Sequence, residues 1–283
     1  MRELHELSEW RAVGDESRAA GRVVGLVPTM GALHDGHRAL IRAAKDCGDF
    51  VIATIFVNPR QFNDAHDLAR YPRTLEADRE VASAAGVDVL VVPALAEMWP
   101  DFPGETRTSV NVAQLGDVLE GAGRPGHFAG VASVVAKLFN LTGACRAYFG
   151  EKDFQQIAVV RQMVRDLSMP VEVVNCAIVR DADGLALSSR NEQLSASGRA
   201  RALALSRAIA SVANTPASAS NLRAILRTTL DDAALAVEYA EIVDSHNLCA
   251  LGNDVTGPAR AVVAAVVEGV RLIDNGPVEL VKG

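Results

Sequence analysis

The sequence has few of the residues that mark metal-binding and disulfide-rich proteins. Its 283 residues include only four cysteines, and aromatic residues make up 5% of the chain. Cys47, Cys145, Cys176 and Cys249 form no CxxC pair and match no histidine cluster. This spacing supports neither a zinc site nor a disulfide framework. We therefore expect free, mostly buried thiols, which suit a reducing cytoplasm.

Long apolar runs and an excess of positive charge are missing as well. No stretch is long and apolar enough to span a membrane, and the opening residues MRELHELSEW lack the apolar core of a signal peptide. The formal net charge of −7 argues against a nucleic-acid-binding protein, which usually has a basic face. We expect a cytoplasmic protein that binds neither membranes nor nucleic acid.

Apolar residues are plentiful, at 49% of the chain, and suffice for a large α/β domain and a smaller second domain. Short apolar runs bounded by glycine and proline predict buried strands, and the segments between them have helical patterns. Parallel strands joined by right-handed helical crossovers are the default for such a series. The predicted strands cover residues 23–27, 50–57, 87–93, 146–149 and 171–179.

The composition changes after Asn191, where alanine-rich helical patterns precede strand-like runs. Helices followed by antiparallel strands indicate an α+β module. Helices are predicted over 195–213 and 219–234, and strands over 236–243, 260–267 and 277–282. The predicted fold class is therefore α/β, with a Rossmann-like parallel-sheet domain over residues 1–184 and a smaller α+β lid domain over residues 185–283.

The most informative stretch is PTMGALHDGH, residues 28–37, which follows the first predicted strand and leads into a helix. Helix N-termini offer unpaired N–H groups that suit a phosphate chain, and glycine allows the backbone to approach it closely. His34 and His37 are three residues apart, so their side chains would share one face and could stabilise charge on phosphorus. A lone histidine in a turn is ordinary, whereas a paired HxGH is typical of adenylating and nucleotidyl-transferring enzymes.

Polar clusters also follow other predicted strands. Asn58 and Gln61 come after the second strand, and residues 150–156, GEKDFQQ, come after the fourth. Ligands of open α/β sheets bind beyond the carboxyl ends of the strands, so these clusters are candidate site residues. Asn58 before proline is also common turn chemistry, and the Glu-Lys-Asp run could be a surface ion cluster.

Six motifs in chain order resemble those of the pantothenate synthetase family, the pantoate–β-alanine ligases: GALHDGH, FVNPRQF, YPRT, GRPGHFAGV, YFGEKDFQQ and DGLALSSRN. RLIDN at residues 271–275 continues the resemblance less distinctively. The resemblance implies that ATP and pantoate form pantoyl adenylate and pyrophosphate with the help of Mg²⁺. β-Alanine then displaces AMP. It also implies a homodimer.

The resemblance further implies roles for individual residues. Gln61 and Gln156 would bind pantoate, and Gln61 and Asn58 would lie on the β-alanine side. Catalysis would fall to His34, His37, Lys152 and Arg190, with His37 at the proton-donor position. The implied ATP-binding residues are Met30, Gly31, His34, His37, Gly150, Glu151, Lys152, Asp153, Val179, Leu187, Ser188, Ser189 and Arg190.

The same resemblance bears on four individual residues. Leu187 stands where the family usually has methionine in a KMSKS-like loop, and this swap conserves volume. Asp78, after YPRT, is the candidate magnesium ligand, although a surface acid on a helix explains it equally well. Arg124 and His127 are second-line candidates that we leave outside the catalytic set.

Two alternative functions remain open at this point. A nucleotidyltransferase acting on a small phosphorylated acceptor would share the HxGH turn and the serine-rich loop, but it gives no reason for Gln61 and Gln156. A synthetase-like module that only binds nucleotide or tRNA conflicts with the acidic composition. A purely structural protein would leave the six polar motifs unexplained.

Overall fold

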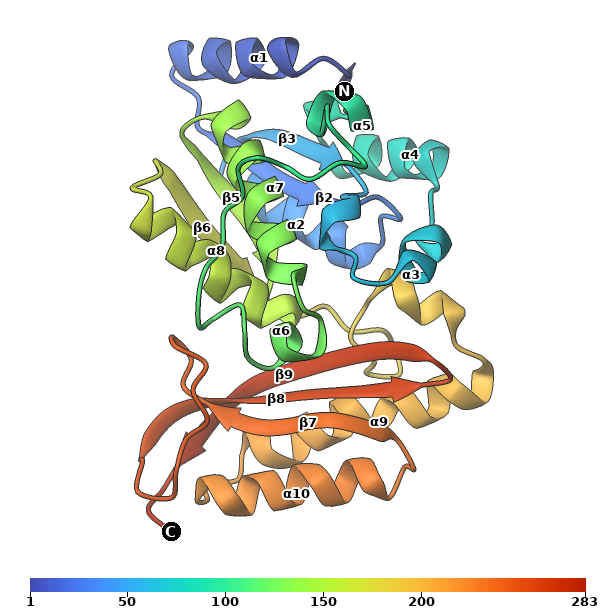
Figure 1. Ribbon diagram of the computed structural model, residues 1–283, viewed down its shortest axis with the longest axis vertical. Helices are drawn as coiled ribbons and strands as arrows, with labels where there is room; N and C mark the ends of the chain where they lie inside the picture. The colour runs from blue at the N-terminus through green and yellow to red at the C-terminus, as the bar shows by residue number, and fades with distance from the viewer. The chain divides into compact units, whose positions relative to one another are not determined.

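The computed structural model describes residues 1–283, which fold into two compact units (Figure 1). The first unit comprises Met1–Glu151 and Gln155–Ala177, and the second comprises Lys152–Phe154 and Ile178–Gly283. The three residues Lys152–Phe154 thus group with the second unit, although the chain on both sides of them belongs to the first.

A six-stranded sheet forms the centre of the first unit, in the order β1-β4-β3-β2-β5-β6. Every pairing in it is parallel, which confirms the predicted Rossmann-like sheet. The strands are β1 (Arg2–Leu4), β2 (Val24–Thr29), β3 (Phe50–Ile55), β4 (Val89–Val91), β5 (Cys145–Gly150) and β6 (Val171–Cys176). Strand β1 was not predicted, because only three residues pair and two of them are charged.

Helices cover this sheet and connect its strands. Helices α2 and α4 share an apolar core with the central strands, and α1 packs against α7 and β2. The α-helices are α1 (Leu7–Ala19), α2 (Asp35–Asp46), α3 (Ala65–Arg70), α4 (Leu75–Ala85), α5 (Leu95–Met98), α6 (Glu120–Gly123), α7 (His127–Thr142) and α8 (Phe154–Asp166). Two 3₁₀ turns, η1 (Pro59–Gln61) and η2 (Glu151–Asp153), follow β3 and β5.

The strand order reverses between β2 and β5. From β2 the chain proceeds to β3 and β4 on one side, whereas β5 and β6 lie on the other. Ligands of such sheets bind outside the carboxyl ends of the strands at this reversal. The HxGH turn follows β2 directly, and Gly150 ends β5. The topology therefore places both predicted nucleotide-binding segments at the expected end of the sheet.

The second unit contains an antiparallel sheet of three strands, in the order β7-β8-β9. Helices α9 and α10 run along one side of it, as Figure 1 shows in orange. The elements are η3 (Ser189–Gln193), α9 (Ala196–Ala213), α10 (Ala219–Asp231), β7 (Ala236–Val243), β8 (Gly257–Val267) and β9 (Val270–Leu280). The predicted last strand began at residue 277, but β9 begins seven positions earlier, at Val270. The first part of β9 was not recognised as a strand, because the polar residues of RLIDN break the apolar pattern.

Candidate functional site

The HxGH turn is shaped by its own histidines. His34 is the N-cap of α2, and its Nδ1 accepts the Gly36 N–H at 3.1 Å. The Nδ1 atom of His37 accepts the His34 N–H at 3.2 Å, and the two ring centroids are 4.2 Å apart. A neutral imidazole whose Nδ1 accepts a hydrogen bond carries its proton on Nε2. Both rings can therefore donate an Nε2–H at the N-terminus of a helix, where anions bind well.

Asp78 of α4 holds the preceding part of this turn. Its side chain is buried, and its two oxygens accept the N–H groups of Ala32 at 3.0 Å and Leu33 at 2.7 Å. The Thr74 hydroxyl donates to the same carboxylate at 3.3 Å. Gly31 has φ +81° and Ala32 has φ +49°, which is uncommon for a residue with a side chain. The carboxylate thus stabilises a left-handed turn just before the histidines.

These contacts decide how Asp78 fits a metal role. Magnesium needs several oxygen ligands in near-octahedral geometry, whereas the Asp78 oxygens face two backbone N–H groups and a hydroxyl. No group of three or more His, Cys, Asp and Glu side chains in the chain could hold a metal ion. The residues do not fit a magnesium ion held by the protein alone, and the metal prediction for Asp78 gains no support from this geometry.

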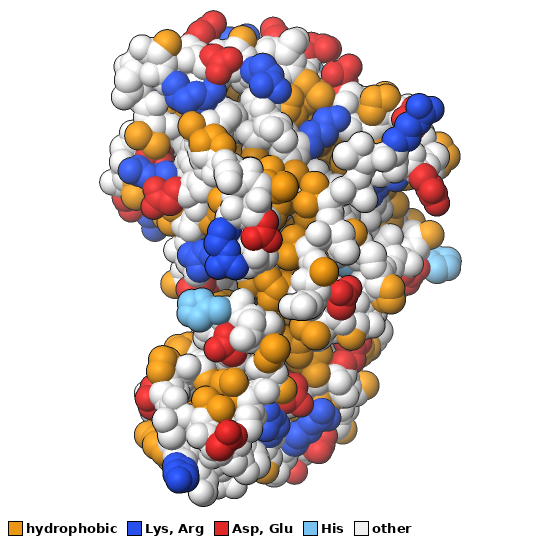
Figure 2. All heavy atoms as spheres, turned by 60° about the vertical axis from the view of Figure 1, so that its left-hand side comes forward, with side chains coloured by type: hydrophobic (Ala, Val, Ile, Leu, Met, Phe, Trp, Pro, Cys, Tyr) orange, Lys and Arg blue, Asp and Glu red, His pale blue; other side chains and the backbone are white.

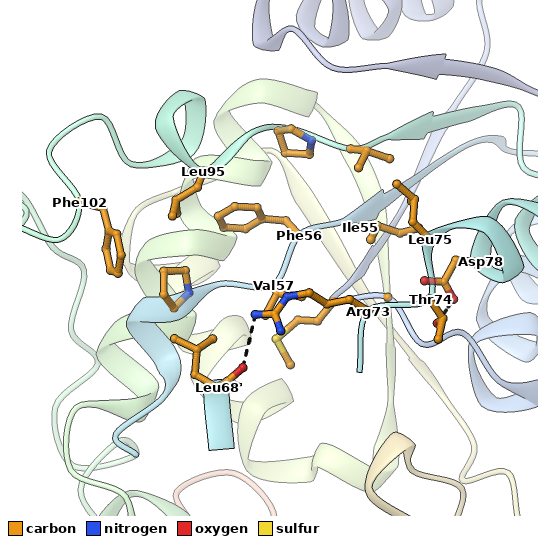
Figure 3. Close-up of a pocket in the computed structure, with 15 residues that line it drawn as sticks. Ile55, Phe56, Val57, Leu68, Arg73, Thr74, Leu75, Asp78, Leu95 and Phe102 are labelled. Carbon is orange, nitrogen blue, oxygen red and sulfur yellow. Dashed lines mark hydrogen bonds between the residues drawn. The ribbon is translucent and has the colours of Figure 1, made fainter. Parts of the chain in front are cut away.

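A cavity of about 380 Å³ lies beside the same turn (Figure 3). Its walls are mostly apolar, and the Arg73 side chain extends across it and donates to the Leu68 carbonyl at 3.4 Å. Of the predicted site residues only Met30, Gly31 and Asp78 line it. The other lining residues are Ile55, Phe56, Val57, Pro59, Leu68, Arg73, Thr74, Leu75, Val92, Pro93, Leu95 and Phe102. The predicted pantoate ligands Gln61 and Gln156 lie outside it.

Asn58 and Gln61 form a connected pair after β3. The Asn58 side-chain amide donates to Gln61 Oε1 at 3.0 Å and to the Gly130 carbonyl at 3.2 Å, and its oxygen accepts from Trp99 Nε1 at 2.9 Å. Asn58 is only 1% exposed. It therefore orients Gln61, whose Nε2 still has hydrogens to donate. Direct contact between Asn58 and β-alanine gains no support from this arrangement.

Arg124 and His127 hold the main chain of Gln61. His127 Nδ1 lies 2.7 Å from the Gln61 carbonyl, and Arg124 Nη1 lies 3.1 Å from His127 Nε2. Because arginine only donates, His127 Nε2 accepts and Nδ1 carries the proton to the carbonyl. Arg124 and His127, which were left outside the predicted catalytic set, thus hold the backbone of Gln61, a predicted substrate ligand.

Gly130 allows the close contact between α7 and η1 beside Gln61, and this role was not predicted from the sequence. A Cβ built on it would lie 2.2 Å from the Arg60 carbonyl, so α7 approaches η1 as closely as only glycine permits. The signal was a glycine inside an otherwise apolar helix, in GHFAGV.

The two adjacent glutamines of α8 differ in their surroundings. Gln155 is buried, and its amide donates to the carbonyls of Leu115 at 2.7 Å and Val118 at 2.8 Å. Its oxygen accepts the Glu120 N–H at 3.0 Å. Gln155 thus anchors the long segment before α7. Gln156 is half-buried, and its predicted role in pantoate binding stays a prediction.

The remaining predicted nucleotide contacts lie in two further segments. Glu151 accepts from Asn175 Nδ2 at 3.3 Å, and Lys152 Nζ lies 3.4 Å from Asp153 Oδ1. The Lys152 side chain is 19% exposed, so the run is not a freely solvated ion cluster.

The serine-rich segment forms the end of a hairpin. The Leu187 N–H donates to the Val179 carbonyl at 3.0 Å, so the backbone of these two predicted ATP ligands is paired. Ser188 is the N-cap of η3, and its hydroxyl accepts the Arg190 N–H at 3.3 Å. The Ser188–Arg190 run therefore opens a short helical turn.

Charged side chains of both signs are mixed on the face drawn in Figure 2, and no extended basic area covers that face. No helix of the structure is long and apolar enough to cross a membrane.

Known proteins resemble the chain over nearly its whole length. The family model for pantoate-beta-alanine ligase matches residues 2–277. A pantothenate synthetase from Paracoccus denitrificans is 48% identical over 98% of each chain. The crystal structure of a pantothenate synthetase from Thermus thermophilus has a TM-score of 0.89 and 45% identity, and covers 98% of this chain and 99% of its own.

A third relative is described together with its ligands. The pantoate-beta-alanine ligase from Francisella tularensis, complexed with beta-gamma ATP and beta-alanine, has a TM-score of 0.79 and 32% identity over 98% of this chain and 97% of its own. With its parallel sheet, its HxGH turn and these likenesses, the chain belongs to the pantoate–β-alanine ligase family.

Proposed function

We propose that this chain condenses pantoate with β-alanine in two steps, through a pantoyl adenylate, with release of pyrophosphate and AMP. The observation that carries the proposal is the pair of Nε2–H donors at the start of α2, next along the sheet edge from the oriented Gln61. The first feature suits a phosphate chain, and the second suits a small polar co-substrate. Family membership supports the same assignment.

In the first step a pantoate carboxylate oxygen attacks the α-phosphorus of ATP, and the bond from that phosphorus to the bridging oxygen breaks. Negative charge grows on the phosphate oxygens and on the departing pyrophosphate. His34 and His37 donate Nε2–H bonds to that charge, and the Lys152 ammonium and the Arg190 guanidinium neutralise it. Little covalent chemistry is asked of the protein, whose main task is alignment and charge stabilisation.

In the second step the neutral amine of β-alanine attacks the activated carbonyl, and AMP leaves with the electron pair of the broken C–O bond. The nitrogen loses one proton to the departing phosphate or to water, which leaves a neutral amide. Gln61 and Gln156 hold the pantoyl group during this step. Gln61 does so with a fixed orientation, because Asn58 occupies its carbonyl oxygen. A glutamine that cannot rotate presents its donor to the same substrate oxygen in both steps.

The proposal includes magnesium, a homodimer and a cytoplasmic location. Magnesium would arrive with the triphosphate, since Mg²⁺ commonly keeps phosphate and water as most of its ligands and Asp78 is engaged elsewhere. The homodimer and the location rest on the resemblance to the family, and light scattering of the purified protein tests the dimer.

Isotope exchange tests the proposed reaction directly. Labelled pyrophosphate should exchange into ATP when pantoate is present and β-alanine is absent, because the first step is reversible and complete in itself. AMP release should rise when β-alanine is added. H37A should lower the exchange rate by about two to three decades, the scale for one positioned electrostatic donor. Absence of pantoate-dependent exchange by folded wild-type protein with saturating magnesium would refute the assignment.

A further inference from the structure

The RLIDN motif at residues 271–275 has no place in the chemistry described so far. It lies in β9, and Asp274 and Asn275 are 3% and 4% exposed. A buried polar side chain is costly unless it is hydrogen-bonded, so two adjacent ones in a strand call for specific partners. Each has a partner in one of the two segments that the resemblance assigns to ATP, and Asn275 has a further partner in β8.

Asn275 holds the segment that carries Lys152. Its Nδ2 donates to the Lys152 carbonyl at 2.9 Å, and its Oδ1 accepts from Arg260 Nε at 2.8 Å. The Arg260 guanidinium in turn lies 4.0 Å from the centre of the Phe154 ring. Strands β8 and β9 therefore grip the segment Lys152–Phe154 through its main chain at one end and its aromatic ring at the other. Both contacts agree with the grouping of the three residues with the second unit.

Asp274 holds the hairpin that leads to Ser188. Its carboxylate accepts from both terminal nitrogens of Arg180, at 2.6 and 3.0 Å. Arg180 also donates to the Gly184 carbonyl at 3.2 Å and pairs with Ala186 across the hairpin. A bidentate pair on a buried carboxylate has a fixed direction, unlike a fully exposed ion pair. The base of the hairpin is thus tied to β9 at one residue.

We propose that Asp274 and Asn275 are positioning residues for the adenylation step. Successive side chains of a strand point to opposite faces, so one dipeptide can reach two separate segments. Asn275 sets the place of Lys152, and Asp274 sets the place of the hairpin that ends in Ser188–Arg190. The positions of Lys152 and Arg190, which would neutralise phosphate charge, therefore both depend on β9. The inference rests on the proposed function, and neither residue touches substrate.

N275D is the sharpest variant for a test. It keeps an oxygen for Arg260 but replaces the donor to the Lys152 carbonyl with an acceptor, which repels that carbonyl. We expect the rate constant of pantoate-dependent pyrophosphate exchange to fall about tenfold or more, as for other small misplacements of a catalytic group. The KM for β-alanine should stay unchanged. V278A is the control, since Val278 lies in the same strand and is buried in the core of the second unit.

A double-mutant cycle separates positioning from general destabilisation. If Asn275 acts through Lys152, N275D should cause no further loss in a K152A background. An equal fold-loss in both backgrounds would overturn the proposal for Asn275. The same cycle with D274N and R190A tests Asp274. N275S, which introduces no charge, repeats the first cycle if N275D does not fold.

The outcomes also separate this inference from the proposed function. Wild-type protein without exchange activity would contradict the function itself. Normal wild-type exchange with additive losses in both cycles would contradict only the positioning role. Losses by V278A as large as those by N275D would also contradict it, because they would show that the exchange step responds to any weakening of β9.

Discussion

At the scale of single residues, the protonation state of each imidazole decides which hydrogen bonds the two histidines of the HxGH turn can make. Each Nδ1 accepts a backbone N–H, and this makes each neutral ring an Nε2–H donor. A doubly protonated ring could not accept at Nδ1, so it would lose its bond to the first turn of α2. The histidines can therefore combine these Nδ1 bonds with the proposed phosphate-binding role only while they are neutral.

Asp78 offers a prediction at the same scale. D78N should weaken the turn, because its amide places N–H donors against the backbone N–H of Ala32 or Leu33. We expect the free energy of unfolding to fall by about 1.5–3 kcal/mol, as for lost hydrogen bonds to a charged group. Hydrogen exchange at those two amides should speed up, and the rate of adenylation should fall.

The control for this variant is E76Q, which changes an exposed acid on the same helix. The magnesium concentration that gives half-maximal activity should be the same for D78N, E76Q and wild type. A large rise for D78N, with amide exchange at Ala32 and Leu33 unaltered, would make Asp78 a metal ligand instead.

The expectation that the four cysteines are free is confirmed, but the expectation that most of them are buried was wrong, because Cys47 and Cys249 are exposed. Burial raises the pKa of Cys145 to about 12 and that of Cys176 to about 11. Only the thiolate reacts with iodoacetamide, so both should resist it at pH 8 while exposed Cys47 and Cys249 react. Mass spectrometry of native and unfolded protein measures this. Rapid labelling of Cys145 in folded protein would show that β5 opens.

At the scale of whole elements, the contact between α7 and η1 carries the arrangement around Gln61. G130A would push a methyl group into the Arg60 carbonyl. We expect a loss of about 1–3 kcal/mol in stability from overpacking, and a higher KM for pantoate because Asn58 and His127 would shift with Gln61. N140A, on an exposed position of the same helix, should change neither quantity. An unchanged KM for pantoate in G130A would remove Gln61 orientation from the account.

Most elements could be predicted from the sequence where the signal was local. Strands β2 and β3 are apolar runs between turn residues, and the HxGH turn has a recognisable spacing. The start of β9 could not be predicted, because the partners of its buried polar residues are not local. Asp274 pairs with Arg180, and Asn275 bonds to Arg260 and to the Lys152 carbonyl. Asp78 looked like a surface acid for the same reason, since its two backbone partners, Ala32 and Leu33, lie more than forty positions earlier.

At the scale of the whole molecule, the chain forms two units, and one short segment, Lys152–Phe154, groups with the second unit although the chain on both sides of it belongs to the first. The first unit has its own sheet, and α9, α10 and the antiparallel sheet form a separate core. The predicted domain boundary, between residues 184 and 185, lies after the division between Ala177 and Ile178. The lid role of the second domain stays a prediction. A fragment of residues 1–185 should keep the circular dichroism of a folded α/β protein but lose pyrophosphate exchange, because it lacks β9. Wild-type exchange by that fragment would contradict both the lid prediction and the grip on Lys152.

The grouping of Lys152–Phe154 with the second unit has a consequence for how such proteins can be recombined. A chimera that joins two relatives at position 177 looks like a clean exchange of halves, yet it takes the lysine segment from one parent and the strand that holds it from the other. Such hybrids should fold but lose activity whenever the parents differ at Phe154, Arg260 or Asn275. Grafting those positions together from one parent should restore it. The residues that must come from one parent are thus discontinuous in the sequence, and a single crossover point chosen from chain order alone would separate them.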